Sequence, residues 1–155
     1  MDQLLQAIIT GLFGILAALI TAYRSDLIFM LHRRKRNIKG KWIGQASEKL
    51  LDDSSRELTY SAAFEFHQFG SRVTGNIHST GNNGEHYQAQ VKGQMEDEHF
   101  VTLVARSSSP QDFNFGVVLL ELDAKGKHLN GYALGNGLSA HGIALAKMSL
   151  SKDPN

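Results

Sequence analysis

The chain has 155 residues, a formal net charge of +1 and no cysteine. Its length suits one modest domain plus a short additional segment, because domains most often contain about 100 to 150 residues. The lack of cysteine excludes a disulfide framework and a thiolate zinc site. Residues 1–36 hold five basic and two acidic side chains, which leaves eleven basic and thirteen acidic ones beyond them. This mildly acidic remainder argues against a protein that coats DNA or RNA through its charge.

The N-terminal segment is predicted to be a transmembrane helix. From Leu4 to Tyr23 every residue is apolar or small except Gln6, Thr10 and Thr21. Twenty helical residues match a hydrocarbon core of about 30 Å, so we expect the lipid bilayer as a partner. A cleaved signal peptide is the competing interpretation, but the chain begins Met-Asp-Gln, without the basic residues that such peptides carry.

Basic side chains follow this segment and predict its orientation. They are Arg24, Arg33, Arg34, Lys35, Arg36, Lys39 and Lys41. The positive-inside rule then places the N-terminus outside and the rest of the chain in the cytoplasm. A nuclear-localisation signal at residues 33–36 is the weaker alternative. A second apolar stretch, Leu27 to Leu31, is too short to cross a bilayer alone, so we expect it to continue the helix or to lie at the interface.

Small residues recur along the predicted helix at spacings of four and three. This spacing places them on one face, where they would let a second helix approach closely. The alternative is that glycine and alanine are simply common in membrane helices. The candidate assembly positions are Ala7, Gly11, Gly14, Ala18 and Thr21.

After Gly40 the apolar pattern changes from helical runs to alternation. Leu58, Tyr60, Ala62 and Phe64 are apolar, and the residues between them are mostly polar, as expected for a half-buried strand. Eight such strands without a helix predict an all-β domain, either an up-and-down barrel or a sandwich. The strands are expected near residues 41–48, 57–68, 72–79, 86–94, 98–106, 113–122, 127–135 and 142–150.

Three of these strands contain a glycine between apolar neighbours, at Gly75, Gly93 and Gly131. A glycine weakens a strand unless the backbone must bend or approach another group closely. The pattern therefore favours an eight-stranded, lipocalin-like barrel over a sandwich. The predicted organisation is a transmembrane helix with a basic segment over residues 1–36, a ligand-sensing barrel over 37–151 and a tail over 152–155.

No catalytic or metal-binding pattern emerges. The seven histidines are scattered over different strands, so we expect no metal site, no cofactor and no enzymatic activity. The glycine-rich stretch 135–142 opens no helix, unlike a phosphate-binding loop. The acidic cluster 96–98 is interpreted as a solvated turn.

The predicted binding site lies at one rim of the barrel. Alternating strand directions place the connections 49–56, 80–85, 107–112 and 136–141 at the end away from the anchor, and the other turns toward the membrane. Aromatic rings there could stack on bases, and arginines could bind phosphates. The alternatives are core packing for the aromatic rings and solvation for the arginines. The candidate ligand-binding residues are Arg56, Tyr60, Tyr87, Arg106, Phe113, Asn114, Asn136 and Ser139.

Several features together carry a family resemblance. They are the apolar N-terminal segment, the basic segment, the opening Gly40-Lys41-Trp42-Ile43-Gly44, the three strand glycines and the closing stretch from Gly142 to Leu150. With these features the chain resembles the two-transmembrane, β-strand-rich effectors of bacterial CBASS antiphage defence. It departs from them in having one predicted span where the family has two. Its Gly-x-Trp opening is also found in lipocalin-like barrels.

The resemblance implies a function. A cyclic di- or oligonucleotide made during phage infection would bind the cytoplasmic barrel of a protein in the bacterial inner membrane. Binding would drive homo-oligomerisation of the membrane helices, membrane disruption and cell death. The alternative is a membrane-tethered, lipocalin-like barrel that binds a small apolar ligand.

Overall fold

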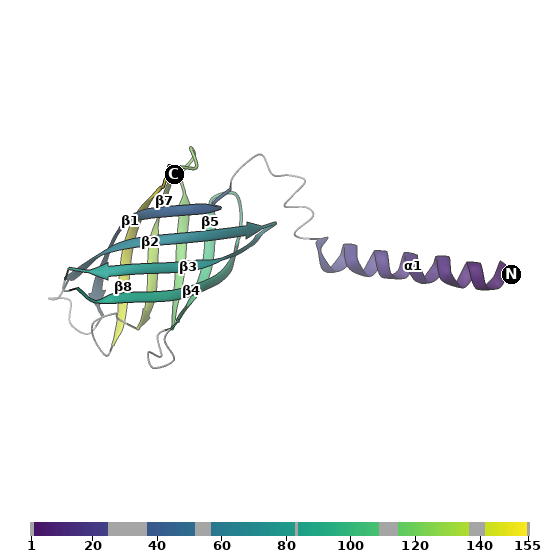
Figure 1. Cartoon of the computed structure of the whole chain (residues 1–155), viewed down its shortest axis with the longest axis horizontal. Helices are drawn as coiled ribbons and strands as arrows, with labels where there is room; N and C mark the ends of the chain where they lie inside the picture. The colour runs from purple at the N-terminus through teal and green to yellow at the C-terminus, as the bar shows by residue number, and fades with distance from the viewer. Residues whose placement is uncertain are drawn as a thin grey trace. The chain divides into compact units, whose positions relative to one another are not determined.

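The structure is a computed structural model that describes residues 2–24, 37–51, 57–82, 84–108, 115–136 and 142–154, with side chains described from residue 12 onward. The chain divides into two compact units, Met1–Arg34 and Lys35–Asn155 (Figure 1). Each unit is considered by itself below.

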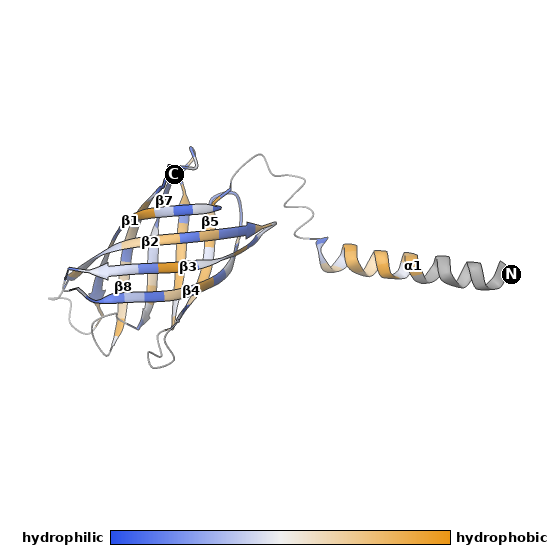
Figure 2. Ribbon diagram, viewed as in Figure 1, coloured by the Kyte–Doolittle hydropathy of each residue, from blue (hydrophilic) through white to orange (hydrophobic). Residues whose placement is uncertain are grey.

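The described part of the first unit forms the helix α1 (Asp2–Ala22). Its described side chains are exposed and largely apolar, as the orange turns in Figure 2 illustrate. Near its end the Thr21 hydroxyl donates a 2.9 Å hydrogen bond to the carbonyl oxygen of Ala17. The helical prediction for this segment is confirmed. Within the part of the chain that the structure describes, no helix combines the length and apolar character needed to cross a membrane.

The second unit is a closed, eight-stranded antiparallel barrel in which every strand pairs with its neighbours in sequence and the last strand pairs with the first. The up-and-down prediction is confirmed, and the sandwich alternative is wrong. Each observed strand end lies within two residues of its predicted position. The strands are β1 (Gly40–Leu50), β2 (Glu57–Phe69), β3 (Arg72–Gly81), β4 (His86–Met95), β5 (Phe100–Ser107), β6 (Phe115–Leu122), β7 (His128–Asn136) and β8 (Ile143–Lys152).

The three strand glycines lie where neighbouring strands approach closely. A Cβ atom added at Gly75, Gly93 or Gly131 would overlap a backbone carbonyl oxygen of the adjacent strand. The strand positions that sequence analysis marked as bending points are therefore sites where a side chain has no room. The carbonyl oxygens concerned belong to Glu65, Thr102 and Leu119, respectively.

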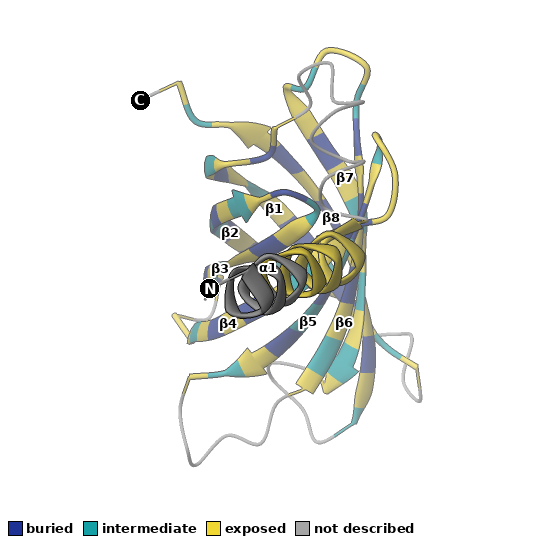
Figure 3. Ribbon diagram, turned by 90° about the vertical axis from the view of Figure 1, so that its right-hand side faces the viewer, coloured by how far each residue is buried: buried dark blue, intermediate teal, exposed yellow. Residues whose placement is uncertain are grey.

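The end of the barrel at which β1 begins is filled by large side chains. Trp42 is fully buried there, and its Nε1 donates a 2.7 Å hydrogen bond to the carbonyl oxygen of Ile38. The Lys152 Nζ lies 5.5 Å from the centre of the Trp42 ring, within reach of a cation–π contact. Figure 3 shows the alternation of buried and exposed residues along the strands that builds this core. The inner residues packed at this end include Phe66, Val73, Leu120, Leu122, Leu129 and Leu150.

Candidate functional site

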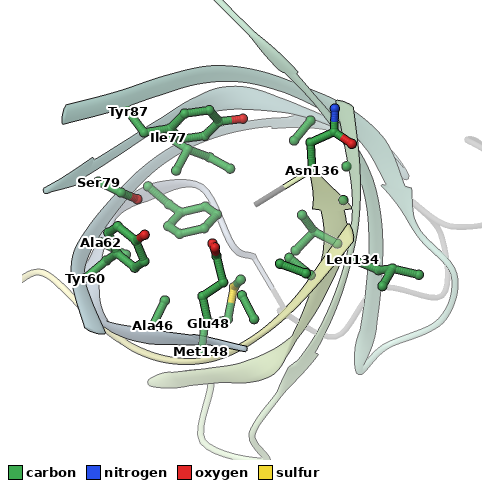
Figure 4. Close-up of a pocket in the computed structure, with 18 of the residues that line it drawn as sticks. Ala46, Glu48, Tyr60, Ala62, Ile77, Ser79, Tyr87, Leu134, Asn136 and Met148 are labelled. Carbon is green, nitrogen blue, oxygen red and sulfur yellow. The ribbon is translucent and has the colours of Figure 1, made fainter. Parts of the chain in front are cut away.

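A cavity of about 90 Å³ lies at the opposite end of the barrel from Trp42 (Figure 4). Residues of all eight strands line it, at the ends of β1, β3, β5 and β7 and at the starts of β2, β4, β6 and β8. This end is the rim that the strand order predicted for a ligand. The up-and-down topology determines which loops meet at this rim.

The cavity exists because inward-facing positions near this rim carry small side chains. At the closed end the inner positions hold tryptophan, phenylalanine, leucine and valine, which fill the barrel. Near the open rim six alanines replace them and leave space unfilled. These residues are Ala46, Ala62, Ala105, Ala133, Ala144 and Ala146.

One carboxyl group projects into this apolar space. Glu48 lies on β1 and is only 5% exposed. It shares the inner face of that strand with Trp42 and Ala46, as the alternating burial of β1 requires. A buried acid that lines a cavity is a candidate group for ligand recognition.

Sequence analysis missed Glu48, although a signal was available. The residue falls on the same alternating face as Trp42, two positions after Ala46. An acidic residue at an inward-facing strand position marks either a binding group or a buried polar contact. A single acid within a strand belongs to no cluster of polar residues, so the pattern that marked the other candidates does not mark Glu48.

Other polar groups surround the same space. Tyr60 and Ser79 are buried, Tyr87 is half-buried, and all three line the cavity. Tyr87 pairs directly with Ser79 across β3 and β4. In Figure 4 the side chains of Glu48 and Tyr87 extend toward the middle of the opening. The cavity lining thus combines hydroxyl groups and a carboxyl group with aromatic and aliphatic side chains. Such a lining suits an apolar ligand with a few polar atoms.

The structure brings three of the predicted binding residues together. Tyr60, Tyr87 and Asn136 line the cavity. Arg106 does not: it is exposed on β5, and the neighbouring Ala105 faces inward in its place. The remaining four, which are Arg56, Phe113, Asn114 and Ser139, lie outside the described residues. Ligand contact by any of the eight residues stays a prediction.

The described lining residues include no lysine, arginine or histidine. Over the described ranges, no group of three or more His, Asp or Glu side chains is arranged to hold a metal ion. Glu48 is thus the carboxylic acid among the described lining residues.

The predicted assembly positions lie on α1. Because a helix has 3.6 residues per turn, Gly14, Ala18 and Thr21 share one face of it. The side chains of Ala7 and Gly11 lie outside the described part, although their backbone belongs to the same helix. Helix–helix contact through this face stays a prediction.

Comparison of the sequence with models of known families and with curated proteins finds no match. Among solved structures, EF1p2_mFAP2b bound to DFHBI is similar, with a TM-score of 0.59 and 12% identity over 75% of this chain and 94% of that one. The redesigned β-barrel mFAP1 bound to DFHBI has a TM-score of 0.56 and 11% identity, covering 74% and 94% of the two chains. The S-type phycobiliprotein lyase CPES from Guillardia theta has a TM-score of 0.48 and 8% identity, covering 76% and 89%. At these identities the likeness to the two DFHBI-bound barrels concerns the fold alone.

Proposed function

We propose that the barrel is a binding module for a small organic ligand that has a compact, largely apolar body and an N–H donor or a positive charge. The observation that carries this proposal is the buried carboxyl group of Glu48 in a cavity lined by alanines. Two barrels of similar fold are described as bound to a small molecule, DFHBI, which agrees with a ligand-binding use of this architecture.

The size of the cavity limits the ligand. Pockets for drug-sized molecules usually measure about 300 to 1,000 Å³. The cavity here measures about 90 Å³, so it suits a single ring or a comparable group. A larger ligand would insert one such group between Tyr60 and Tyr87 and leave the rest at the rim.

The charge of the cavity limits the ligand further. A hydrogen bond between a charged group and its partner contributes roughly 1.5 to 3 kcal/mol, and a buried carboxylate gains most from a cationic donor. An anion placed beside Glu48 would instead suffer repulsion in surroundings of low dielectric. We therefore expect ligand charge to control affinity.

Three probes of nearly equal shape test this proposal: benzamidinium, benzamide and benzoate, titrated into the full chain and followed by NMR. Benzamidinium should bind about tenfold or more tightly than benzoate, with benzamide between them. In the Glu48→Gln variant this order should collapse, because the side chain keeps its size and loses its charge. An unchanged order in the variant, or no binding of any probe to the wild type, would refute the proposal.

A second candidate is the cyclic-nucleotide effector implied by the family resemblance. It is favoured by the aromatic rings of Tyr60 and Tyr87 in the cavity, on which a base could stack, and by Glu48, which could accept hydrogen bonds from the N–H edge of a guanine. In this proposal the phosphates lie outside the described cavity wall. The predicted transmembrane segment, residues 4–23, would anchor the protein once across the bacterial inner membrane, with the barrel in the cytoplasm.

The effector proposal has its own test. Inducing the full chain in bacteria together with a cyclic-nucleotide synthase should collapse the membrane potential, whereas either protein alone should not. Leucine at both Gly11 and Gly14 should prevent the collapse and leave nucleotide binding intact. Collapse without the synthase, or no binding to any cyclic dinucleotide, would contradict this function.

A further inference from the structure

The outer surface of the barrel carries a polar region and an apolar region. On β3 and β4 the outward-facing positions hold polar side chains, such as Thr74, Asn76, Gln90 and Lys92. On β6, β7 and β8 many outward-facing positions hold large apolar side chains that are 40–53% exposed. These residues, called the apolar wall below, are Phe115, Val117, Leu119, Tyr132, Leu134, Ile143 and Leu145.

The strand register makes the apolar wall continuous. Val117 pairs with Leu134, and Leu134 pairs with Leu145, so one row crosses three strands. Leu119 and Tyr132 form the next row. Soluble monomers rarely expose contiguous apolar patches of this kind unless the patch binds something. The apolar wall lies on the outside of the strands, whereas Glu48 lies on the inner face of β1; Phe115 and Leu134, at the rim, also line the cavity.

Basic side chains border the apolar wall on both sides. On β5, Arg106 pairs with Phe115, and on β8, Lys147 pairs with Tyr132. Lys92 of β4 lies one strand further out, opposite Val104 of β5. Glu121 is the acidic residue that follows Leu119 on the outer face of β6. The border is thus mostly positive around an apolar centre that includes a tyrosine.

We infer that the apolar wall rests on an anionic lipid bilayer, with its aliphatic and aromatic side chains in the interfacial layer and its basic border against the headgroups. Apolar side chains flanked by lysine and arginine are the usual means by which a surface binds such a bilayer. Tyrosine is also enriched at the level of the headgroups. This inference goes beyond the proposed ligand binding and does not depend on it.

The charges favour a bilayer over a second copy of the chain. In a two-fold dimer the same patch would face itself. With the two-fold axis along the strands, the β5 edge with Arg106 would meet the β8 edge with Lys147 of the other copy. With the axis across the strands, each edge would meet its own counterpart. Both arrangements bring basic edges together, whereas an anionic lipid surface neutralises them.

The absence of cysteine allows a direct experiment, because single cysteines can be labelled selectively. A nitrobenzoxadiazole dye is attached to the full chain at Val117→Cys on the apolar wall or, as a control, at Asn76→Cys on the outer face of β3. The labelled proteins are mixed with vesicles of phosphatidylcholine and phosphatidylglycerol that contain nitroxide-labelled lipid. Quenching should be several-fold stronger at position 117 than at position 76. It should fall when phosphatidylglycerol is omitted or when Arg106 and Lys147 are both changed to glutamine.

Other outcomes would overturn the inference. Equal quenching at the two positions would mean that the barrel has no preferred face toward the bilayer. Concentration-dependent energy transfer between chains labelled at position 117, without lipid, would assign the apolar wall to a second copy. A blue-shifted, water-protected dye at position 117 in dilute, lipid-free protein would assign the wall to another segment of the same chain.

Discussion

The Trp42 indole and the Ile38 carbonyl are joined by a 2.7 Å hydrogen bond, and both residues are fully buried at the closed end of the barrel. The bond ties the start of β1 to the segment that precedes it. It also satisfies the indole N–H where water has no access. The closed end of the barrel therefore depends on a specific donor as well as on apolar volume.

We expect Trp42→Phe to destabilise the barrel by about 1–3 kcal/mol, because it removes this donor and leaves a carbonyl oxygen buried. Urea unfolding of the full chain measures the change. Tyr132→Phe provides the control, since Tyr132 is half-exposed on the outside of the barrel and should change stability by less than about 0.5 kcal/mol. Equal effects of the two substitutions would contradict the role given to the indole.

Gly93→Ala should destabilise the barrel by about 1–3 kcal/mol or more, because the new Cβ would meet the carbonyl oxygen of Thr102 and come within 2.8 Å of the Leu103 Cα. The matched control is Gly116→Ala on β6, whose new Cβ would have its nearest neighbour at 3.3 Å, the carbonyl oxygen of Leu134. Thermal unfolding compares the two variants. A greater loss of stability in the Gly116 variant would show that close strand approach does not explain Gly93.

Asp123 should make stability depend on pH in the acid range. Its carboxylate accepts hydrogen bonds from the backbone N–H groups of His128 at 3.0 Å and Lys127 at 2.6 Å. The bond from His128 is the largest cause that lowers the pKa of Asp123 below its ordinary value of 3.8. Because the folded pKa is the lower one, the stabilisation is complete above the ordinary value and is lost as pH falls through the folded value.

The measurement is the difference in free energy of unfolding between the wild type and Asp123→Asn across acid pH. This difference should favour the wild type at neutral pH and shrink as the carboxylate becomes protonated. A difference that grew with acidity would contradict the hydrogen-bonding role of the ionised group.

Glu48→Met should weaken the binding of benzamidinium about tenfold or more, because it replaces the carboxyl group that lines the cavity by an apolar side chain of similar length. The control is Glu121→Met on the exposed face of β6, which should leave this binding unchanged. Equal binding to the Glu48 variant and the wild type would remove the carboxyl group from the ligand site.

The strands and the closed barrel could be predicted because their signals are local. Alternation marked each strand, and glycines at Gly75, Gly93 and Gly131 indicated that the strands bend into a barrel. The rim at which the cavity lies was predicted from the order and direction of the strands. The helix α1 could likewise be recognised from its long, largely apolar run.

The cavity lining and the apolar wall were harder to predict. On β6 the run Val117-Val118-Leu119-Leu120 is apolar on both faces, so alternation cannot say which face points inward. Only the register shows that Val118 and Leu120 fill the core while Val117 and Leu119 lie outside. The outward position of Arg106 was missed for a similar reason. Its inward-facing neighbour, Ala105, is small and does not show clearly which face of β5 points inward.

Because β8 pairs with β1, the described barrel offers no sheet edge on which another strand could add. Strand addition and edge-to-edge aggregation, which threaten open sheets, are thereby blocked along the whole circumference. Any assembly of this protein through its barrel must consequently depend on side-chain contacts. Single substitutions can remove such contacts without disturbing the hydrogen bonds between the strands. The residues on the outer surface can therefore vary while the inner cavity stays unchanged.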